Sequence, residues 1–208
     1  SSHADAGAVL HKLSSTSFSQ HKSPPSTSTE ARYYAPPTTG ATASACAAFA
    51  LGSIVYDLLP SPSMQSYADQ LKNAAISAWN YLDQNKAYSD YDNAGFSTAR
   101  FKDAPSRQAN NRASAAAYLY YLTGNTNYRL YFDDTASKYN PVIKSSYIDP
   151  FDELTIESAL FYTLIPGATS SIVNTIKSNY MSAITNSTGD YYGKYKDSTD
   201  AYRAYLRS

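Results

Sequence analysis

Residues 41–59, "ATASACAAFALGSIVYDLL", decide the fold class of this chain. Apolar residues recur in this stretch at i, i+3 and i+4 spacing, which predicts an amphipathic α-helix. The residues of this apolar face are Ala47, Leu51, Ile54, Val55 and Leu58. Within it, the longest apolar run is "ACAAFALGSIVYDLL" over 45–59, which Gly52, Ser53 and Asp57 interrupt and which is too short to span a bilayer. We therefore expect a buried core helix.

The same helical pattern continues on the C-terminal side of this stretch. After Ser61, which can cap a helix, and Pro62 at its first position, a second helix over 63–85 is predicted. Further helices are predicted over 107–124, 125–139, 150–167, 169–186 and 198–208. Gly124 and the Asn140-Pro141 and Pro166-Gly167 pairs end three of them. Short turns between helices indicate antiparallel hairpins packed side by side, so the fold class is all-α.

On the N-terminal side the chain has a different character. Residues 14–40 are rich in Ser, Thr and Pro and show no helical periodicity. The Pro24-Pro25 and Pro36-Pro37 pairs exclude a helix there. We expect one domain over 1–208, with an extended region over 1–40 and helical hairpins over 41–208.

Composition narrows the classes of partner. Lys and Arg together number 17, and so do Asp and Glu, so the net charge is zero and neither nucleic acid nor an anionic membrane is expected as a partner. The 21 Tyr residues, with many Ser, Thr and Asn, are typical of extracellular proteins and sugar binders. The first residues show no signal-peptide pattern, and a mature secreted chain would look the same. Cys46, the single cysteine, is expected to be a small core residue.

Four segments carry a family resemblance by their order and spacing. They are "DAGAVLHKLSSTSF", "EARYYAPPTTGATASACAAFALGSIVYD", "AISAWNYLDQN" and "NRASAAAYLYYLTGNTNY". Together they resemble glycoside hydrolase family 9, the inverting cellulases. The resemblance covers nearly the whole chain and implies an (α/α)6 barrel of about twelve helical segments arranged as hairpins, of which the predicted helices supply about half.

The resemblance also implies where the catalytic residues lie. The family's catalytic base belongs to an Asp-Ala-Gly-Asp motif well before the "HKL" turn, whereas Asp5-Ala6-Gly7-Ala8 runs directly into that turn. Asp5 therefore matches a loop residue of the turn. The general acid, a Glu of the far C-terminal part, also falls outside the chain. We expect no catalytic residue in this segment, and the segment alone to be inactive.

Four residues are candidates for binding substrate. His11 matches the turn histidine that reaches the glucose-binding cleft in such cellulases, although a loop histidine bonded to nearby groups is the equal alternative. Lys12 beside it is expected to be a solvated charge. Phe151 falls where relatives often have a Trp that stacks on a sugar ring. Tyr191 and Tyr192 lie in a Gly-containing loop and could form a sugar platform.

The tyrosines of the predicted third helix form a second set. Tyr118, Tyr120 and Tyr121 are expected at core or rim positions because of their helical spacing.

No motif for a transition metal or a cofactor is present, and calcium is only weakly indicated. Asp90, Asp92 and Asn93 offer oxygen ligands, but an Asp/Asn-Gly turn is the favoured interpretation. Glu153 and Glu157 share a helix face, and we attribute them to the positive end of a helix dipole and not to an acid–base pair.

Two functions remain open from the sequence. The first is a segment of a secreted endo-β-1,4-glucanase that provides a polysaccharide-binding wall for β-1,4-glucan or a related polymer. The second is a non-catalytic extracellular protein of the same fold that binds carbohydrate or assembles with itself. The loss of family residues at Asn110-Asn111 and Ser114 favours the second, and the resemblance favours the first. Partners are then the missing barrel half or copies of the chain.

Overall fold

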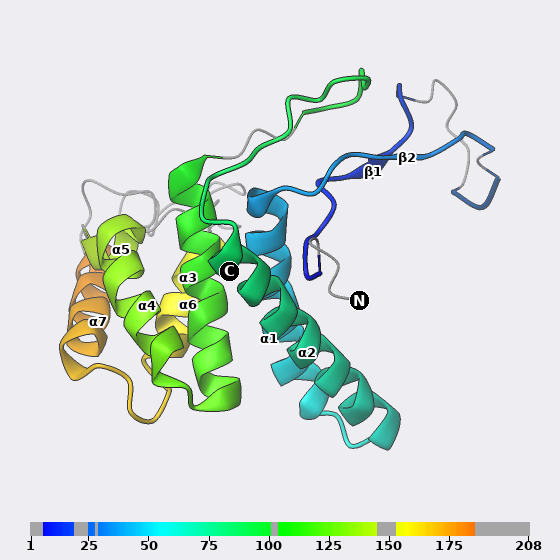
Figure 1. Ribbon diagram of the computed structural model, residues 1–208. Helices are drawn as coiled ribbons and strands as arrows, with labels where there is room; N and C mark the ends of the chain where they lie inside the picture. Colours follow the sequence, from blue (N-terminus) through cyan, green and yellow to red (C-terminus); the bar gives the residue numbers. More distant parts are fainter. Residues whose placement is uncertain (1–5, 19–24, 28, 101–103, 145–152, 186–208) are drawn as a thin grey trace, which may run out of the picture.

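The computed structural model of the chain describes residues 6–18, 25–27, 29–100, 104–144 and 153–185 (Figure 1). Helices dominate these residues. They are α1 Thr39–Asp57, α2 Pro62–Gln84, α3 Pro105–Thr123, α4 Thr126–Tyr139, α5 Pro141–Lys144, α6 Glu153–Tyr162 and α7 Ser170–Thr185. A short 3-10 helix, Pro25–Thr27, and two short strands, β1 Leu13–Ser14 and β2 Tyr33–Tyr34, lie in the N-terminal region.

The predicted all-α fold of helical hairpins is confirmed. Helices α1 and α2 form one hairpin and α3 and α4 a second, while α3 also packs against α1 and α6 (Figure 1). The long helices of the described residues form three consecutive pairs, α1–α2, α3–α4 and α6–α7. Three hairpins correspond to about half of an (α/α)6 barrel.

Several predicted boundaries differ from the observed ones. The short helix α5 directly follows Asn140, where a break was expected, because the Asn140 side chain caps it by accepting the Val142 N–H at 3.0 Å. The fifth predicted helix ends at Tyr162, five residues before Gly167, because the intervening residues form tight turns. The helix predicted over 198–208 lies outside the described residues.

The buried face of α1 differs from the predicted one. Val55 is 50% exposed and Leu58 is 77% exposed, although both were expected to be buried. Ala47 and Ile54 of the predicted face are buried, and the other fully buried apolar residues of α1 are small: Ala43, Cys46 and Ala50. Small side chains allow α2 and α3 to approach α1 closely, whereas the far end of the α1–α2 hairpin extends beyond the other helices (Figure 1).

Helix α1 is also longer than the apolar run suggested. Its 19 residues are enough, by length and composition alone, to cross a membrane, so the expectation that the stretch is too short is wrong. A core helix of a soluble protein passes the same test. Because α1 packs against α2 and α3, we interpret it as a core helix.

An arginine connects three helices at the centre of the body. The Arg112 guanidinium of α3 lies 4.4 Å from the Trp79 ring and 4.7 Å from the Tyr131 ring. It also forms an ion pair with Asp83 at the end of α2. Cation–π attraction of the guanidinium to both rings, which meet edge to face, joins α2, α3 and α4.

A polar cluster joins α4 to the turn before α7. The Tyr162 hydroxyl donates to Asp133 Oδ1 at 2.6 Å, and the Thr169 hydroxyl donates to Asp133 Oδ2 at 2.5 Å. The Thr169 N–H in turn donates to the Tyr162 oxygen at 3.1 Å. Burial, followed by the bond to the Asp133 carboxylate, raises the pKa of Tyr162 to about 12.

Candidate functional site

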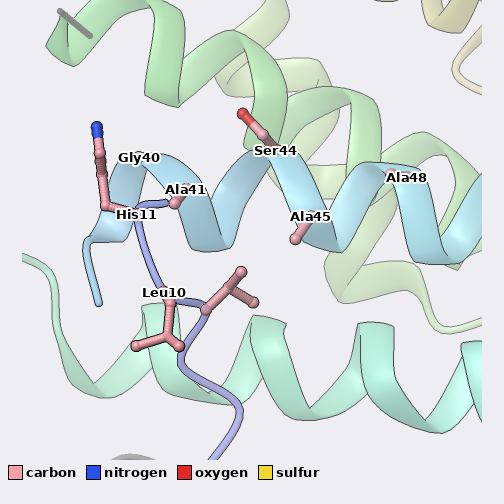
Figure 2. Close-up of a pocket in the computed structure, with 8 residues that line it drawn as sticks. Leu10, His11, Gly40, Ala41, Ser44, Ala45 and Ala48 are labelled. Carbon is pink, nitrogen blue, oxygen red and sulfur yellow. The ribbon is translucent and has the colours of Figure 1, made fainter. Parts of the chain in front are cut away.

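A pocket of about 430 Å³ lies at the N-terminal end of α1 (Figure 2). Two segments that are far apart in the sequence form its walls. The extended N-terminal segment contributes Val9, Leu10 and His11, and α1 contributes Gly40, Ala41, Ser44, Ala45 and Ala48. The small residues of α1 leave the space of the pocket open, because no long side chain projects from this part of the helix.

Backbone hydrogen bonds hold the extended segment against the start of α1. The Val9 N–H donates to Thr42 Oγ1 at 3.0 Å, and the Val9 carbonyl accepts the Thr38 N–H at 3.3 Å. The His11 N–H donates to the Pro36 carbonyl at 3.1 Å. These bonds continue the antiparallel pairing of β1 with β2, so the segment is a two-stranded ribbon that ends at the pocket.

The His11 ring is fixed by its neighbours. Its Nδ1 lies 3.1 Å from Thr38 Oγ1, and its ring contacts Tyr91 with a centroid separation of 5.7 Å. Thr38 is the N-cap of α1, because its side chain also accepts the Ala41 N–H. Figure 2 shows the His11 side chain beside Gly40, at the end of the pocket where α1 begins. The helix start and the imidazole position therefore depend on the same threonine.

A hydroxyl group on the helical wall is also fixed. Asn111 of α3 is only 8% exposed, and its Nδ2 donates to Ser44 Oγ at 2.7 Å. Ser44 lines the pocket, and its side chain is labelled on α1 in Figure 2. Neither Ser44 nor Thr38 was predicted from the sequence as a site residue. Asn111, which donates to Ser44, was noted only because it departs from the family pattern.

The expectation that Lys12 is a solvated charge is wrong. Its Nζ donates to Asn93 Oδ1 and, at 3.0 Å, to Thr98 Oγ1, and it lies 4.4 Å from the centroid of the Phe96 ring. Strand alternation directs Lys12 to the opposite face of the ribbon from His11, where the 89–98 loop covers it. Lys12 therefore anchors the ribbon to this loop.

The acidic residues of that loop take part in turn and ion-pair contacts. Asp92 Oδ1 accepts the Ala94 N–H at 2.9 Å, and Asn93 has a φ of 72°, so the predicted Asp/Asn-Gly turn is confirmed. Asp90 forms an ion pair with Arg100 at 3.2 Å. Within the described residues, no group of three His, Cys, Asp or Glu is placed to hold a metal ion.

The remaining candidates divide between described and undescribed residues. Phe151, Tyr191 and Tyr192 lie outside the described residues, as does Asp5. Glu157 is exposed on α6. The core or rim positions expected for the tyrosines of α3 are confirmed, since Tyr118 and Tyr120 are buried and Tyr121 is 49% exposed.

The expected core position of Cys46 is also confirmed. Cys46 is fully buried, and its thiol donates to the Ala75 carbonyl at 3.2 Å. Burial raises the pKa of the Cys46 thiol to about 12, because the thiolate has no access to water. Cys46 therefore fills space between α1 and α2 and takes no part in the pocket.

These features define a class of protein: a body of antiparallel helical hairpins with an open pocket where an extended ribbon meets a core helix. The family model for Glycosyl hydrolase family 9 matches residues 4–206. The chain therefore belongs to glycosyl hydrolase family 9, as the resemblance predicted.

Individual relatives agree with this assignment. Over 179 residues the chain is 27% identical to Endoglucanase D of Acetivibrio thermocellus, a match that covers 85% of this chain and 27% of the relative. The chain thus spans about a quarter of the length of that relative.

Solved structures have the same fold. The crystal structure of GH family 9 endoglucanase J30 matches with a TM-score of 0.68 and 24% identity, over 85% of this chain and 31% of that one. A metagenome-derived endoglucanase of the same family matches with a TM-score of 0.70 and 22% identity, over the same shares of the two chains. A third structure, AaCel9A in complex with cellobiose-like isofagomine, matches with a TM-score of 0.69 and 20% identity, over 83% of this chain and 31% of the other.

Proposed function

We propose that this chain forms one wall of the substrate groove of an endo-β-1,4-glucanase that acts outside the cell and hydrolyses with inversion. The observation that carries the proposal is the position of His11 at the end of an open pocket that Ser44 also lines. Family membership supports the substrate class, because Endoglucanase D is among the relatives. The partner is β-1,4-glucan or a related polysaccharide.

The chemistry of the pocket suits a sugar. A pyranose ring presents hydroxyl groups at its edge and C–H groups on its faces, and the pocket offers partners for both. Because Nδ1 of His11 faces Thr38, Nε2 is the ring atom that remains to exchange a hydrogen bond with a sugar hydroxyl. Leu10, Ala45 and Ala48 supply the apolar surface on which a ring face would lie.

We assign the general acid and the general base to parts of the protein other than this pocket. An inverting glycosidase needs two carboxyl groups about 6.5–9.5 Å apart, one on each side of the bond that breaks. The described residues that line the pocket include no Asp or Glu. On this assignment the chain binds and orients the glucan, while hydrolysis needs residues beyond the pocket.

Titration calorimetry of the purified chain with cellotriose tests the binding role. We expect His11→Ala to weaken binding about tenfold, because the variant loses one hydrogen bond between a polar group and the sugar in a partly buried site. Lys177→Ala on α7 is the matched control, because Lys177 is exposed and does not line the pocket. Equal affinities of His11→Ala and wild type would overturn the proposal.

An activity assay tests the assignment of the catalytic groups. We expect the pure chain to release no reducing ends from carboxymethylcellulose. Turnover by the pure chain, retained through a final chromatography step, would show that the acid and base lie within it.

One observation favours a second function, a non-catalytic carbohydrate-binding or self-assembling protein of the same fold. The tip of the α1–α2 hairpin exposes large apolar side chains. They are Val55, Leu58, Leu59, Met64 and Tyr67. Exposed apolar clusters of this kind mark surfaces that another chain or segment covers. Light scattering separates the two functions, since a concentration-dependent dimer would support assembly and a monomer would contradict it.

A further inference from the structure

We propose that the ribbon extends the sugar-binding surface beyond the pocket, and that Tyr34 is the aromatic residue on which a further glucosyl ring stacks. The inference rests on the proposed function, and it names a specificity residue outside the pocket. Tyr34 is 69% exposed, which is the largest exposure among the described tyrosines. An aromatic side chain that is this exposed loses apolar burial unless something covers it.

The strand register places Tyr34 on the same face as His11. Leu13 pairs with Tyr34 and Ser14 with Tyr33, and the His11 N–H bonds to the Pro36 carbonyl in the same antiparallel register. Since side chains alternate along a strand, His11, Leu13 and Tyr34 share one face of the ribbon. We call these three residues the ribbon face.

The opposite face of the ribbon is covered along Lys12, Ser14 and Ala35, while Tyr33 at its end is 51% exposed. Lys12 bonds to Thr98 Oγ1 at 3.0 Å, and Ser14 Oγ lies 3.2 Å from the same oxygen. Ala35, which pairs with Lys12, is 1% exposed. The 89–98 loop also meets the ribbon face where Tyr91 contacts the His11 ring, so the part of this face that remains open to a ligand lies at Leu13 and Tyr34. Leu13 on it is 54% exposed.

The spacing suits a polymer of sugar rings. His11 and Tyr34 are diagonal neighbours across the two strands, and side chains in this relation lie about 7–8 Å apart. This separation is comparable to the size of one sugar ring, so a glucan whose first rings fill the pocket as far as His11 would place a later ring on Tyr34. Leu13 adds apolar surface beside the Tyr34 ring. The surface therefore fits an extended glucan chain better than a single sugar.

The neighbouring tyrosine provides a matched control. Tyr33 has the same chemistry and is 51% exposed, but it lies on the face toward Thr98. Tyr33→Ala removes as much side chain as Tyr34→Ala without touching the ribbon face. Tyr34→Phe keeps the ring and removes only the hydroxyl.

The experiment compares cellotriose and cellohexaose binding by calorimetry, using the whole chain and its variants. We expect Tyr34→Ala to weaken cellohexaose binding about five- to tenfold and to leave cellotriose binding within about twofold, because only the longer ligand reaches Tyr34. Tyr33→Ala and Tyr34→Phe are expected to bind both ligands like wild type. Thermal melts of each variant establish that the fold is retained.

The outcomes separate this inference from the proposed function. If His11→Ala weakens binding of both ligands while Tyr34→Ala and Tyr33→Ala behave alike, the pocket binds glucan and the ribbon face does not. If Tyr34→Ala weakens cellotriose and cellohexaose equally, Tyr34 belongs to the pocket and does not extend it, which also overturns the inference. If His11→Ala changes neither affinity, the proposed function itself is overturned.

Discussion

Gly7 is the residue at which a single added methyl group should most disturb both fold and site. It has a φ of +90°, a conformation that only glycine adopts without strain. A Cβ at this position would overlap the carbonyl oxygen of Ser77 and lie 2.5 Å from its carbonyl carbon and 3.0 Å from the Ala78 nitrogen. All three atoms belong to the backbone of α2, so no side-chain rotation relieves the overlap.

The magnitude follows from two separate contributions. An L-residue in the left-handed region costs about 1–2 kcal/mol of folding free energy. Forcing an atom into a closely packed site adds about 1–3 kcal/mol, because backbone must move. We therefore expect Gly7→Ala to lower the free energy of unfolding by about 2–5 kcal/mol.

Gly95→Ala isolates the first contribution. Gly95 has a φ of +82°, and nothing lies within 4 Å of the Cβ it would carry. Urea denaturation followed by circular dichroism should give a loss of about 1–2 kcal/mol for Gly95→Ala and a larger loss for Gly7→Ala. Equal losses in the two variants would refute the claim that Gly7 is required by its packing against α2.

The same substitution should weaken sugar binding. Gly7 lies two residues before Val9, whose N–H bonds to Thr42 on α1. Displacement of the chain at Gly7 therefore moves the segment that places His11 at the pocket. Gly95→Ala provides the comparison for this readout as well, and we expect it to bind cellotriose like wild type.

Three further predictions concern the core. The Cys46 thiol, with its pKa raised to about 12, should not react with a thiol reagent at pH 8 until urea unfolds the chain; reaction in native buffer would contradict its burial. The pKa of Tyr162 is likewise raised to about 12, so its contribution to stability is complete below about pH 10 and is lost as the pH rises toward 12. The loss amounts to about 1.4 kcal/mol per pH unit, and Tyr162→Phe should therefore flatten the loss of stability measured between pH 10 and 11. Arg112→Lys should destabilise the chain by about 1–2 kcal/mol, because a compact ammonium cannot keep the contacts with Trp79, Tyr131 and Asp83 together; a wild-type urea midpoint would contradict this.

The helical body could be predicted because its signals are local. The 3.6-residue spacing and the breakers Gly124 and Pro62 fixed where helices begin and end, and both breakers occupy the expected positions. The buried face of α1 could not be predicted in the same way. Hydrophobicity predicted that Val55 and Leu58 are buried, but closely packed helices bury small residues. Which helices pack against α1 cannot be read from its own sequence.

The candidate site shows the same division. His11 could be found because a family motif surrounds it, whereas the role of Lys12 depends on Asn93 and Thr98, more than 80 positions later. No periodicity relates residues at that separation. Ser44 was missed for a related reason, since its hydroxyl acquires a fixed position only through Asn111 on another helix.

Thr38 shows why fold and site cannot be separated at this end of the molecule. Its hydroxyl accepts the Ala41 N–H as the cap of α1 and meets His11 Nδ1, so one atom both begins the core helix and orients the imidazole. Pro37 directly before it has no N–H to donate at the outer edge of this strand, and among the described residues the ribbon has two strands. Pro36 and Pro37 therefore both exclude a helix before Thr38 and keep the chain beside the pocket extended. Under the proposed function, a sugar polymer would lie along this extended face, which exists because the helix starts where the prolines end.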